Sequence, residues 1–127
     1  MKRLLIAALI ILLLAAVMYL HIKHLETLTE ELIQQVETAT RHIEQKEWRK
    51  AEKLAEEIMV QWEDHAFYLH ITLRHSDIDA IRSSIKEMIA YLDSREDRAE
   101  CLAVAARLIN QLELLLEAEE LTLKNIL

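Results

Sequence analysis

Glycine and proline are both absent from this chain of 127 residues. Glycine supplies the positive φ angles that tight turns, hairpins and phosphate-binding loops need, and proline presets many other turns. The glycine-containing signatures of hydrolases, nucleotide-phosphate loops and dinucleotide-binding folds are therefore missing. We expect helices joined by short polar turns, and we expect that the protein is not an enzyme.

Cysteine is also scarce, because Cys101 is the only one. A single cysteine excludes an intrachain disulfide, and its position far from the N-terminus excludes a lipid-modified N-terminal cysteine. The apolar residues 102–104 that follow it predict a thiol packed inside a helix rather than a nucleophile.

Positive charge is scarce as well. The chain has 15 Lys and Arg against 22 Asp and Glu, which gives a net charge of −7. Lys2 and Arg3 stand at the very start, so setting aside their two charges leaves −9 for the rest. An acidic surface repels phosphate backbones, and we therefore expect no nucleic-acid partner.

One long apolar run contrasts with this charged remainder. Leu4–Leu20 contains no charged side chain and falls at the short end of the roughly 17–25 residues that a spanning helix needs. Its Leu, Ile and Val residues should favour insertion by roughly 3–7 kcal/mol. We predict a transmembrane helix that anchors the chain in the cell membrane over residues 1–22.

The residues that flank the run predict its orientation. Lys2 and Arg3 precede it, and positive flanks stay in the cytoplasm, whereas Tyr19 and His21 suit the opposite interface. We expect a single-pass signal anchor with a cytoplasmic N-terminus and an extracytoplasmic domain over residues 23–127.

A cleaved signal peptide is the alternative, since it also begins with basic residues and an apolar run. Cleavage needs small residues at alternate positions after the run. Ala15 and Ala16 lie inside it, and the residues from Val17 to His21 are bulky. These flanks favour an uncleaved anchor over cleavage.

Apolar residues after the anchor recur at alternating spacings of three and four, the pattern of one face of a helix. Four such stripes predict four helices, with a polar break at 44–47. The stripes are Ile22, Leu25, Thr29, Leu32, Val36, Ala39 and Ile43; Trp48, Ala51, Ala55, Ile58, Trp62, His65 and Leu69; Ile78, Ile81, Ile85, Met88 and Leu92; and Leu102, Ala105, Ile109, Leu112 and Leu116. These faces can be buried only against one another, so the predicted fold class is all-α, with the transmembrane helix continuing into an antiparallel helical bundle of about four helices.

Polar residues mark the ends of the later helices. Ser76 followed by Asp79, and Ser94 followed by Asp97, each place a hydroxyl at a helix N-cap with an acid three residues on. We expect two helices to begin at these serines. The acidic run 117–120 predicts the end of the last helix and leaves a short apolar tail after it.

Several segments together form a pattern that covers nearly the whole chain. They are the start Met1-Lys2-Arg3 with its apolar run, Trp48 and Ala51 opening the second helix, Trp62 closing it, the stretch His75–Asp79, and the ending Leu121–Ile126. The pattern resembles the uncharacterised "domain of unknown function 4363" family of small single-pass membrane proteins from spore-forming Gram-positive bacteria. The resemblance implies a small membrane-tethered protein, often encoded beside a multi-spanning membrane protein, and it implies no activity.

Six histidines raise the question of a metal site. The candidate ligands are His21 and His24 on one expected helix, and His65, His70, His75, Asp77 and Asp79 around the second turn. Structural zinc sites usually show tighter paired spacing, such as two histidines on one helix with an intervening glutamate, and that motif is missing. Membrane-interface and core positions account for these histidines without a metal, so we expect no metal and no cofactor.

Acidic residues are abundant, but those at 26–37 and 113–120 fall between apolar positions at helical spacing and indicate solvated faces. An acid–base pair needs one desolvated group in a cleft, and no residue is marked as such. We name no catalytic residue.

The aromatic pair and the apolar tail are the candidates for partner binding. Trp48 and Trp62 lie on one stripe and should face the same way; a core role is favoured, and a docking surface is the alternative. The tail either folds back onto the bundle or adds to a partner surface. The candidate partner-binding residues are Trp48, Trp62, Leu121, Leu123 and Ile126.

These patterns predict an interaction or scaffold module, held in the lipid bilayer, that holds or regulates a partner membrane protein; a homo-oligomer is compatible with them. The alternative is an extracytoplasmic sensor or ligand-binding helical bundle similar to chemoreceptor ectodomains. A sensor normally continues into a cytoplasmic output domain, whereas only three residues precede the apolar run. Signalling would then have to pass through another protein.

Overall fold

Five helices make up the part of the chain that the structure describes. The computed structural model describes residues 1–95 and 97–126, with side chains among them through residue 125. The helices are α1 (Lys2–Glu44), α2 (Trp48–Asp64), α3 (Ala66–Thr72), α4 (His75–Ser94) and α5 (Arg98–Ile126), and no strand occurs in these ranges. The predicted all-α class is confirmed.

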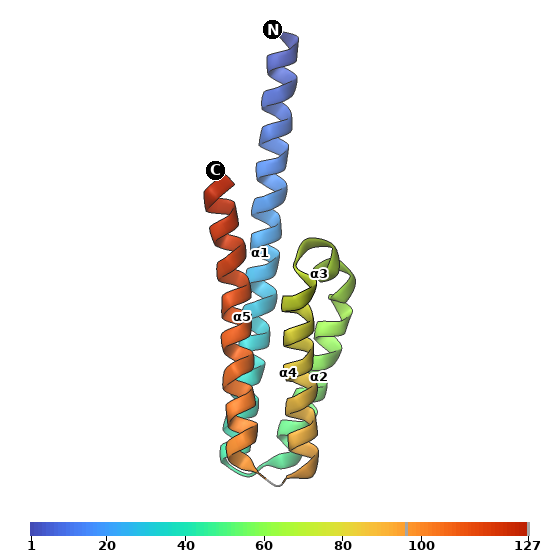
Figure 1. Cartoon of the computed structure of the whole chain (residues 1–127), viewed down its shortest axis with the longest axis vertical. Coiled ribbons are helices and arrows are strands. Elements are labelled where there is room, and N and C mark those ends of the chain that lie inside the picture. Colours follow the sequence, from blue (N-terminus) through green and yellow to red (C-terminus); the bar gives the residue numbers. More distant parts are fainter. Residues whose placement is uncertain (96, 127) are drawn as a thin grey trace.

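The four long helices lie side by side, and neighbours run in opposite directions (Figure 1). Both α1 and α4 contact α2 and α5, so α1 and α4 sit diagonally across a shared core. The short α3 covers one end, the end from which the first half of α1 projects (Figure 1). We call α1 from Ile22 onward, together with α2–α5, the packed body.

The apolar stripes fill the core of the packed body. The stripes predicted for the second half of α1, for α2 through Trp62 and for α4 are buried, except that Trp48 is half-buried. On α5 the predicted face was partly wrong, because Leu102, Ile109 and Leu116 are only half-buried. The buried residues there are Cys101, Val104, Ala105, Leu108, Leu112 and Leu115. Because α5 is apolar around much of its circumference, periodicity fixes its inner face poorly.

The single cysteine belongs to this core. Cys101 is fully buried, and burial raises the pKa of its thiol, with nearby Asp97 adding to the effect. A raised pKa keeps the thiol protonated and poorly nucleophilic. The predicted packed helical thiol is confirmed.

Burial changes abruptly within α1, although the helix itself is unbroken. Through Leu20 nearly every residue is exposed, for example Leu9 at 71% and Leu13 at 64%, whereas Leu25 is at 0%. The first half is long and apolar enough to cross a membrane, judged by length and composition. The change in burial coincides with the end of the apolar run.

The predicted second helix was too long. It was expected to reach Leu69, but α2 ends at Asp64 and the chain kinks at His65 before α3. The amide of His65 donates to the carbonyl of Trp62 at 3.2 Å, three residues back instead of four. The carbonyl left over, that of Gln61, lies 2.9 Å from His65 Nδ1. The histidine side chain thus replaces the missing helical hydrogen bond.

The predicted start of α4 at Ser76 was wrong. The helix begins at His75 with Arg74 as its N-cap, and no side chain bonds to the cap. Leu73 and Ile78 flank this start at the spacing of a hydrophobic staple, and both are buried in the core. Apolar burial, and not a serine hydroxyl, sets where the helix begins.

The predicted start of α5 at Ser94 was also wrong. Ser94 ends α4, and its hydroxyl donates to the carbonyl of Tyr91 at 3.0 Å. Asp97 caps α5 instead, because its Oδ1 accepts from the amides of Ala99 at 2.9 Å and Glu100 at 3.3 Å. An ionised carboxylate is the stronger acceptor and is also favoured by the positive end of the helix dipole.

The acidic run does not end α5, which continues to Ile126. Glutamate is a good helix former, and no glycine or proline interrupts the segment. Residues 121–126 are therefore a helical extension of α5 toward the level of the projecting half of α1 (Figure 1). The predicted apolar tail also includes the last residue of the sequence, Leu127, which lies outside the described residues.

Candidate functional site

Polar and aromatic side chains gather where the projecting half of α1 meets the packed body. His21 and His24 belong to α1, His65 lies at the kink before α3, Tyr68 belongs to α3, and Glu119 belongs to α5. We call these five residues the His–Tyr–Glu cluster. It joins three helices at the end of the body next to the exposed apolar segment.

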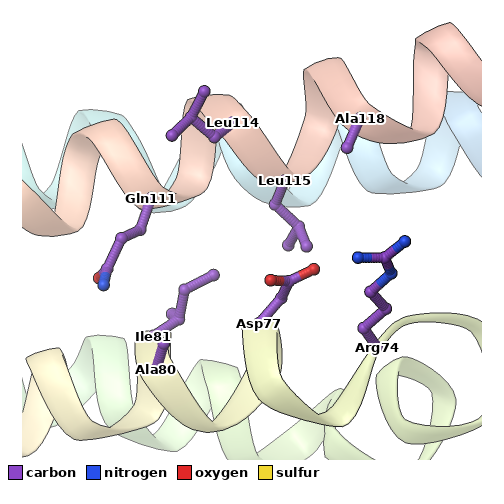
Figure 2. A pocket seen from close by; sticks show the side chains of 8 residues that line it. All are labelled: Arg74, Asp77, Ala80, Ile81, Gln111, Leu114, Leu115 and Ala118. Carbon is purple, nitrogen blue, oxygen red and sulfur yellow. The ribbon is translucent and has the colours of Figure 1, made fainter.

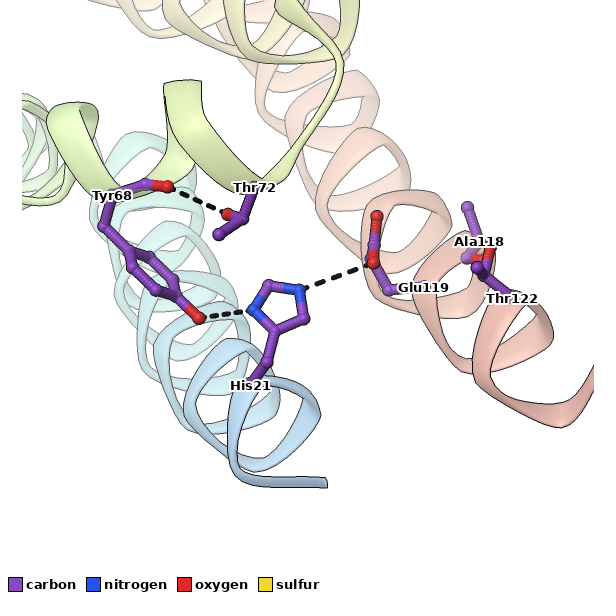
Figure 3. A network of polar contacts seen from close by, with 6 residues as sticks. All are labelled: His21, Tyr68, Thr72, Ala118, Glu119 and Thr122. Carbon is purple, nitrogen blue, oxygen red and sulfur yellow. Dashed lines mark hydrogen bonds and ion pairs between the residues drawn. The ribbon is translucent and has the colours of Figure 1, made fainter. Parts of the chain in front are cut away.

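His21 is the central group of this cluster. Its Nδ1 is hydrogen-bonded to the Tyr68 hydroxyl, and its Nε2 lies 3.4 Å from a carboxylate oxygen of Glu119 (Figure 3). An ionised carboxylate only accepts, so Nε2 carries the hydrogen that faces Glu119. In a neutral imidazole, Nδ1 then accepts from the Tyr68 hydroxyl. The three groups link α3, α1 and α5 in one line.

His24 and His65 extend the cluster by ring contacts. The His24 ring meets the Tyr68 ring edge to face, with 5.0 Å between centroids, and lies 5.6 Å from the His65 ring. Edge-to-face geometry is favourable for aromatic rings because a positive ring edge meets a negative ring face. The packing holds Tyr68 in the position that its hydrogen bond to His21 requires.

The Tyr68 phenol does not have the properties of a nucleophile or a base. Burial raises its pKa above the ordinary value of 10.0, and the negative charge of Glu119 raises it further. The hydroxyl therefore stays protonated at neutral pH and serves as a hydrogen-bond donor. The arrangement is suited to holding helices together, not to activating a substrate.

An open groove of about 640 Å³ lies beside the cluster. Its lining combines Val17, Met18 and Leu20 from the apolar segment with His21, Tyr68 and Glu119 from the cluster. A cavity with an apolar wall and a polar edge matches an amphiphile better than a small polar metabolite.

A second hollow, of about 450 Å³, lies between α4 and α5 (Figure 2). Arg74 and Asp77 stand on one side, while Gln111 and Leu114 stand on the other. Gln111 accepts a hydrogen bond from Ser84 at 2.7 Å, so its carbonyl oxygen is already engaged. Asp77 is the single carboxylate among the lining residues, whereas acid–base catalysis usually pairs two titratable groups.

The histidines do not converge on one point. His70 and His75 form a separate pair with their Nδ1 atoms 2.9 Å apart, and His42 lies 3.3 Å from Glu47 at the opposite end of the body. Within residues 1–95 and 97–126, no group of three or more His, Cys, Asp or Glu side chains is placed to share an ion. That the protein binds no metal remains a prediction.

The candidate partner-binding residues fall into two different environments. Trp62 is 1% exposed and Trp48 is half-buried against the core, so the favoured core role holds for Trp62. Leu121 is 54% exposed and Leu123 is half-buried on the extension of α5. The side chain of Ile126 lies outside the described residues. Leu121 is therefore the most exposed of the candidates whose side chains the structure describes.

Sequence reasoning missed the link between His21, Tyr68 and Glu119. Glu119 was assigned to a solvated face, and Tyr68 was not singled out. His21 and Tyr68 are 47 residues apart in the sequence. The contact between His21 and Glu119 requires α5 to continue through the acidic run. Only the two histidines at the end of the apolar run signalled a site there.

Comparison with known proteins places the packed body, but not the projecting segment, within a defined family. A family model described as a domain of unknown function (DUF4363) matches residues 19–126. The match begins at the end of the apolar run and covers all of α2–α5. No curated protein and no solved structure matches the chain.

Proposed function

The chain belongs to the DUF4363 family of domains of unknown function, and we propose that it is a membrane-tethered helical interaction module that holds a partner membrane protein. The observation that carries this proposal is the unbroken α1, whose apolar first half is exposed while its second half is part of the core. One helix thus connects a segment that needs apolar surroundings with a folded body that has its own core.

The exposed half of α1 supports a tether because its side chains have no protein cover. Leu5 is 71% and Leu12 is 70% exposed, and the residues around them are apolar on every side of the helix. Leaving such a surface in water costs roughly 25 cal/mol per Å² of apolar area. A lipid bilayer removes this cost along the whole segment.

The charges at the start of the chain support a cytoplasmic N-terminus. Lys2 and Arg3 precede the apolar run, whereas Lys23 is the only basic side chain shortly after it apart from histidines. Positive flanks are retained in the cytoplasm, so the packed body lies outside. A reporter that is active only outside the cytoplasm, fused after Leu127, is expected to be active.

The extension of α5 supplies the surface for the partner. Because α5 runs antiparallel to α1 and Glu119 meets His21, residues beyond 119 lie level with residues of α1 before 21. Leu121 is exposed there, beside the last turns of the apolar segment. The surface fits the transmembrane helix of a partner protein near the outer side of the bilayer.

Site-specific photocrosslinking in native membranes tests this proposal. A crosslinking amino acid at Leu121 of the full chain is expected to give a discrete adduct with one membrane protein. Ala103 is the matched control, because it is also exposed on α5 and lies eighteen residues, or five helical turns, back on the same face. Equal capture at both positions, or none at Leu121, would refute the partner surface.

A second candidate function, an extracytoplasmic sensor or ligand-binding body, is favoured by the groove beside the His–Tyr–Glu cluster. It requires saturable binding of an amphiphile by the purified full chain without any other protein. A fluorescent fatty-acid probe measures this binding, and Met18→Trp, which narrows the groove, should abolish it. Capture through Leu121 without probe binding would decide for the interaction module.

A further inference from the structure

α3 carries two large apolar side chains that are exposed instead of packed against the body. Phe67 is 81% exposed and Ile71 is 68% exposed, the highest values for large apolar residues after position 20 whose side chains the structure describes. They are four residues apart and therefore share one face of the helix. Leu69 is buried and Tyr68 is half-buried, so the opposite face of α3 is the one that holds it to the body.

The position of α3 decides what these two side chains meet. Tyr68 bonds His21 and contacts the ring of His24, and these are the first histidines after the apolar run ends at Leu20. α3 is therefore held where the exposed half of α1 joins the packed body, at the end of the body from which that half projects (Figure 1). A bilayer around the apolar run would have its surface at this level.

The charges around α3 suit a lipid surface. Residues 65–76 contain no Asp or Glu, although the whole chain contains 22. The same stretch contains Arg74 and three histidines, and His70 and His75 are exposed. This segment lies between Asp64 and Asp77 and faces Glu119 near Tyr68, but it carries basic groups and no acidic group of its own. It can therefore approach anionic headgroups more readily than the acidic remainder of the body.

From these observations we propose that α3 is an interfacial contact, with Phe67 and Ile71 inserted at the boundary between headgroups and acyl chains of the bilayer that α1 spans. The inference rests on the proposed tether, because the position of α1 in the bilayer determines the depth at which α3 lies. An apolar face of two large side chains beside basic groups is typical of helices that lie in this boundary. The contact gives the body a second attachment to the membrane, separate from α1.

Spin-label accessibility tests the proposal on the full chain in vesicles of phosphatidylethanolamine and phosphatidylglycerol. Labels are attached to Ile71→Cys, to Ala90→Cys on the exposed far part of α4, and to Leu12→Cys in the apolar run. The native Cys101 is fully buried, and the wild-type chain serves as the labelling control. Collisions with lipid-soluble oxygen are compared with collisions with a water-soluble nickel chelate.

The expected result is preference for oxygen at positions 12 and 71 and preference for the nickel chelate at position 90. Oxygen preference at 12 together with nickel preference at 71 would overturn the α3 contact and leave the tether intact. Nickel preference at 12 would overturn both. Protection of position 71 from both reagents would show a protein contact, such as a second copy, and would also overturn the lipid assignment.

A second variant tests whether Phe67 belongs to the same contact. Phe67→Ser is expected to shift the label at position 71 from oxygen preference toward the nickel chelate. Val60→Ser is the matched control, because Val60 is a 60% exposed apolar residue on α2 and should leave the label unchanged. Equal readings in both variants would show that Phe67 does not contribute.

Discussion

The two halves of α1 have the same backbone and different surroundings. From Ile22 to Glu44, buried apolar residues return every three or four positions with charged residues between them, whereas residues 4–20 of the first half contain no charged side chain. A helix with one apolar stripe needs one packing partner, and a helix that is apolar all round needs apolar surroundings on every side. Local propensity makes the helix continuous, and the distribution of apolar residues decides which surroundings each half requires.

The strongest test of the protein-packed half is its largest core residue. Trp62→Ala should lower the free energy of unfolding by about 3–5 kcal/mol, because the cavity left behind cannot fully collapse. Thermal or denaturant unfolding of the full chain in detergent micelles measures this. Trp62→Phe should cost much less, since Trp62 Nε1 has no hydrogen-bond partner among the described residues. A Trp62→Ala chain of unchanged stability would contradict the core role.

The same substitution in each half compares them directly. Leu32→Ala should cost about 2–5 kcal/mol of unfolding free energy, because Leu32 is 0% exposed within the core. Leu12→Ala should leave the unfolding of the packed body within about 0.5 kcal/mol, because Leu12 is 70% exposed and lies outside the core cluster. Unfolding midpoints in micelles measure both. Similar losses in the two variants would mean that the halves are not energetically separate.

The junction between the halves should give a smaller effect. Tyr68→Phe removes the hydroxyl that bonds His21 and should cost about 0.5–1.5 kcal/mol, the usual net value of one hydrogen bond. Tyr91→Phe, at a half-buried tyrosine near the far end of α4, is the control and should cost less. Amide hydrogen exchange in α3 should also speed up in the Tyr68 variant alone. Unchanged exchange there would show that the bond does not hold α3 in place.

The smallest expected effect is at the opposite end of the packed half, in the turn after α1. Hydrogen bonds from Lys50 and then His42 lower the pKa of Glu47 below its ordinary value of 4.5. The ionised carboxylate therefore stabilises the fold above the pKa of the unfolded chain, and this contribution is lost as the pH falls through the lower folded value. Between about pH 5 and 3, the melting temperature of Glu47→Gln should therefore fall slightly less than that of the wild type.

The exposed Glu57 on α2 is the control for that measurement. Glu57→Gln should leave the acid side of the stability profile as in the wild type. Identical profiles for Glu47→Gln and Glu57→Gln would show that the contacts of Glu47 do not contribute in solution.

The sequence predicted the helices well and their ends poorly. Stripes such as Ile78 to Leu92 are periodic over several turns, so the inner faces of most helices follow from spacing. Their number does not, because the predicted second helix is broken at His65 and the chain has five helices in its described part instead of about four. The ends depend on competing local bonds. Ser94 was expected to begin a helix, but Asp97 offers a better acceptor, and the Leu73–Ile78 staple overrides Ser76.

The site was harder to predict for a similar reason. The spacing of His21 and His24 was visible, but their partners come from α3 and α5, and no local pattern marks Tyr68 or Glu119. The kink at His65, which turns α3 across the end of the body, depends on a side-chain bond to Gln61. Phe67 and Ile71 are exposed on α3, and the kink places them at the end of the body instead of along its side.

The unbroken α1 also has a mechanical consequence. Its 43 residues contain no glycine or proline at which it could hinge, so it acts as a lever about 64 Å long. A tilt of about 20° within the bilayer swings its far end, about 33 Å beyond Ile22, sideways by about 11 Å. A bilayer contact at α3 would fix the direction of this swing. Because a spanning helix changes its tilt with the thickness of the bilayer, that thickness would then set the position of the turn after Glu44 relative to the membrane.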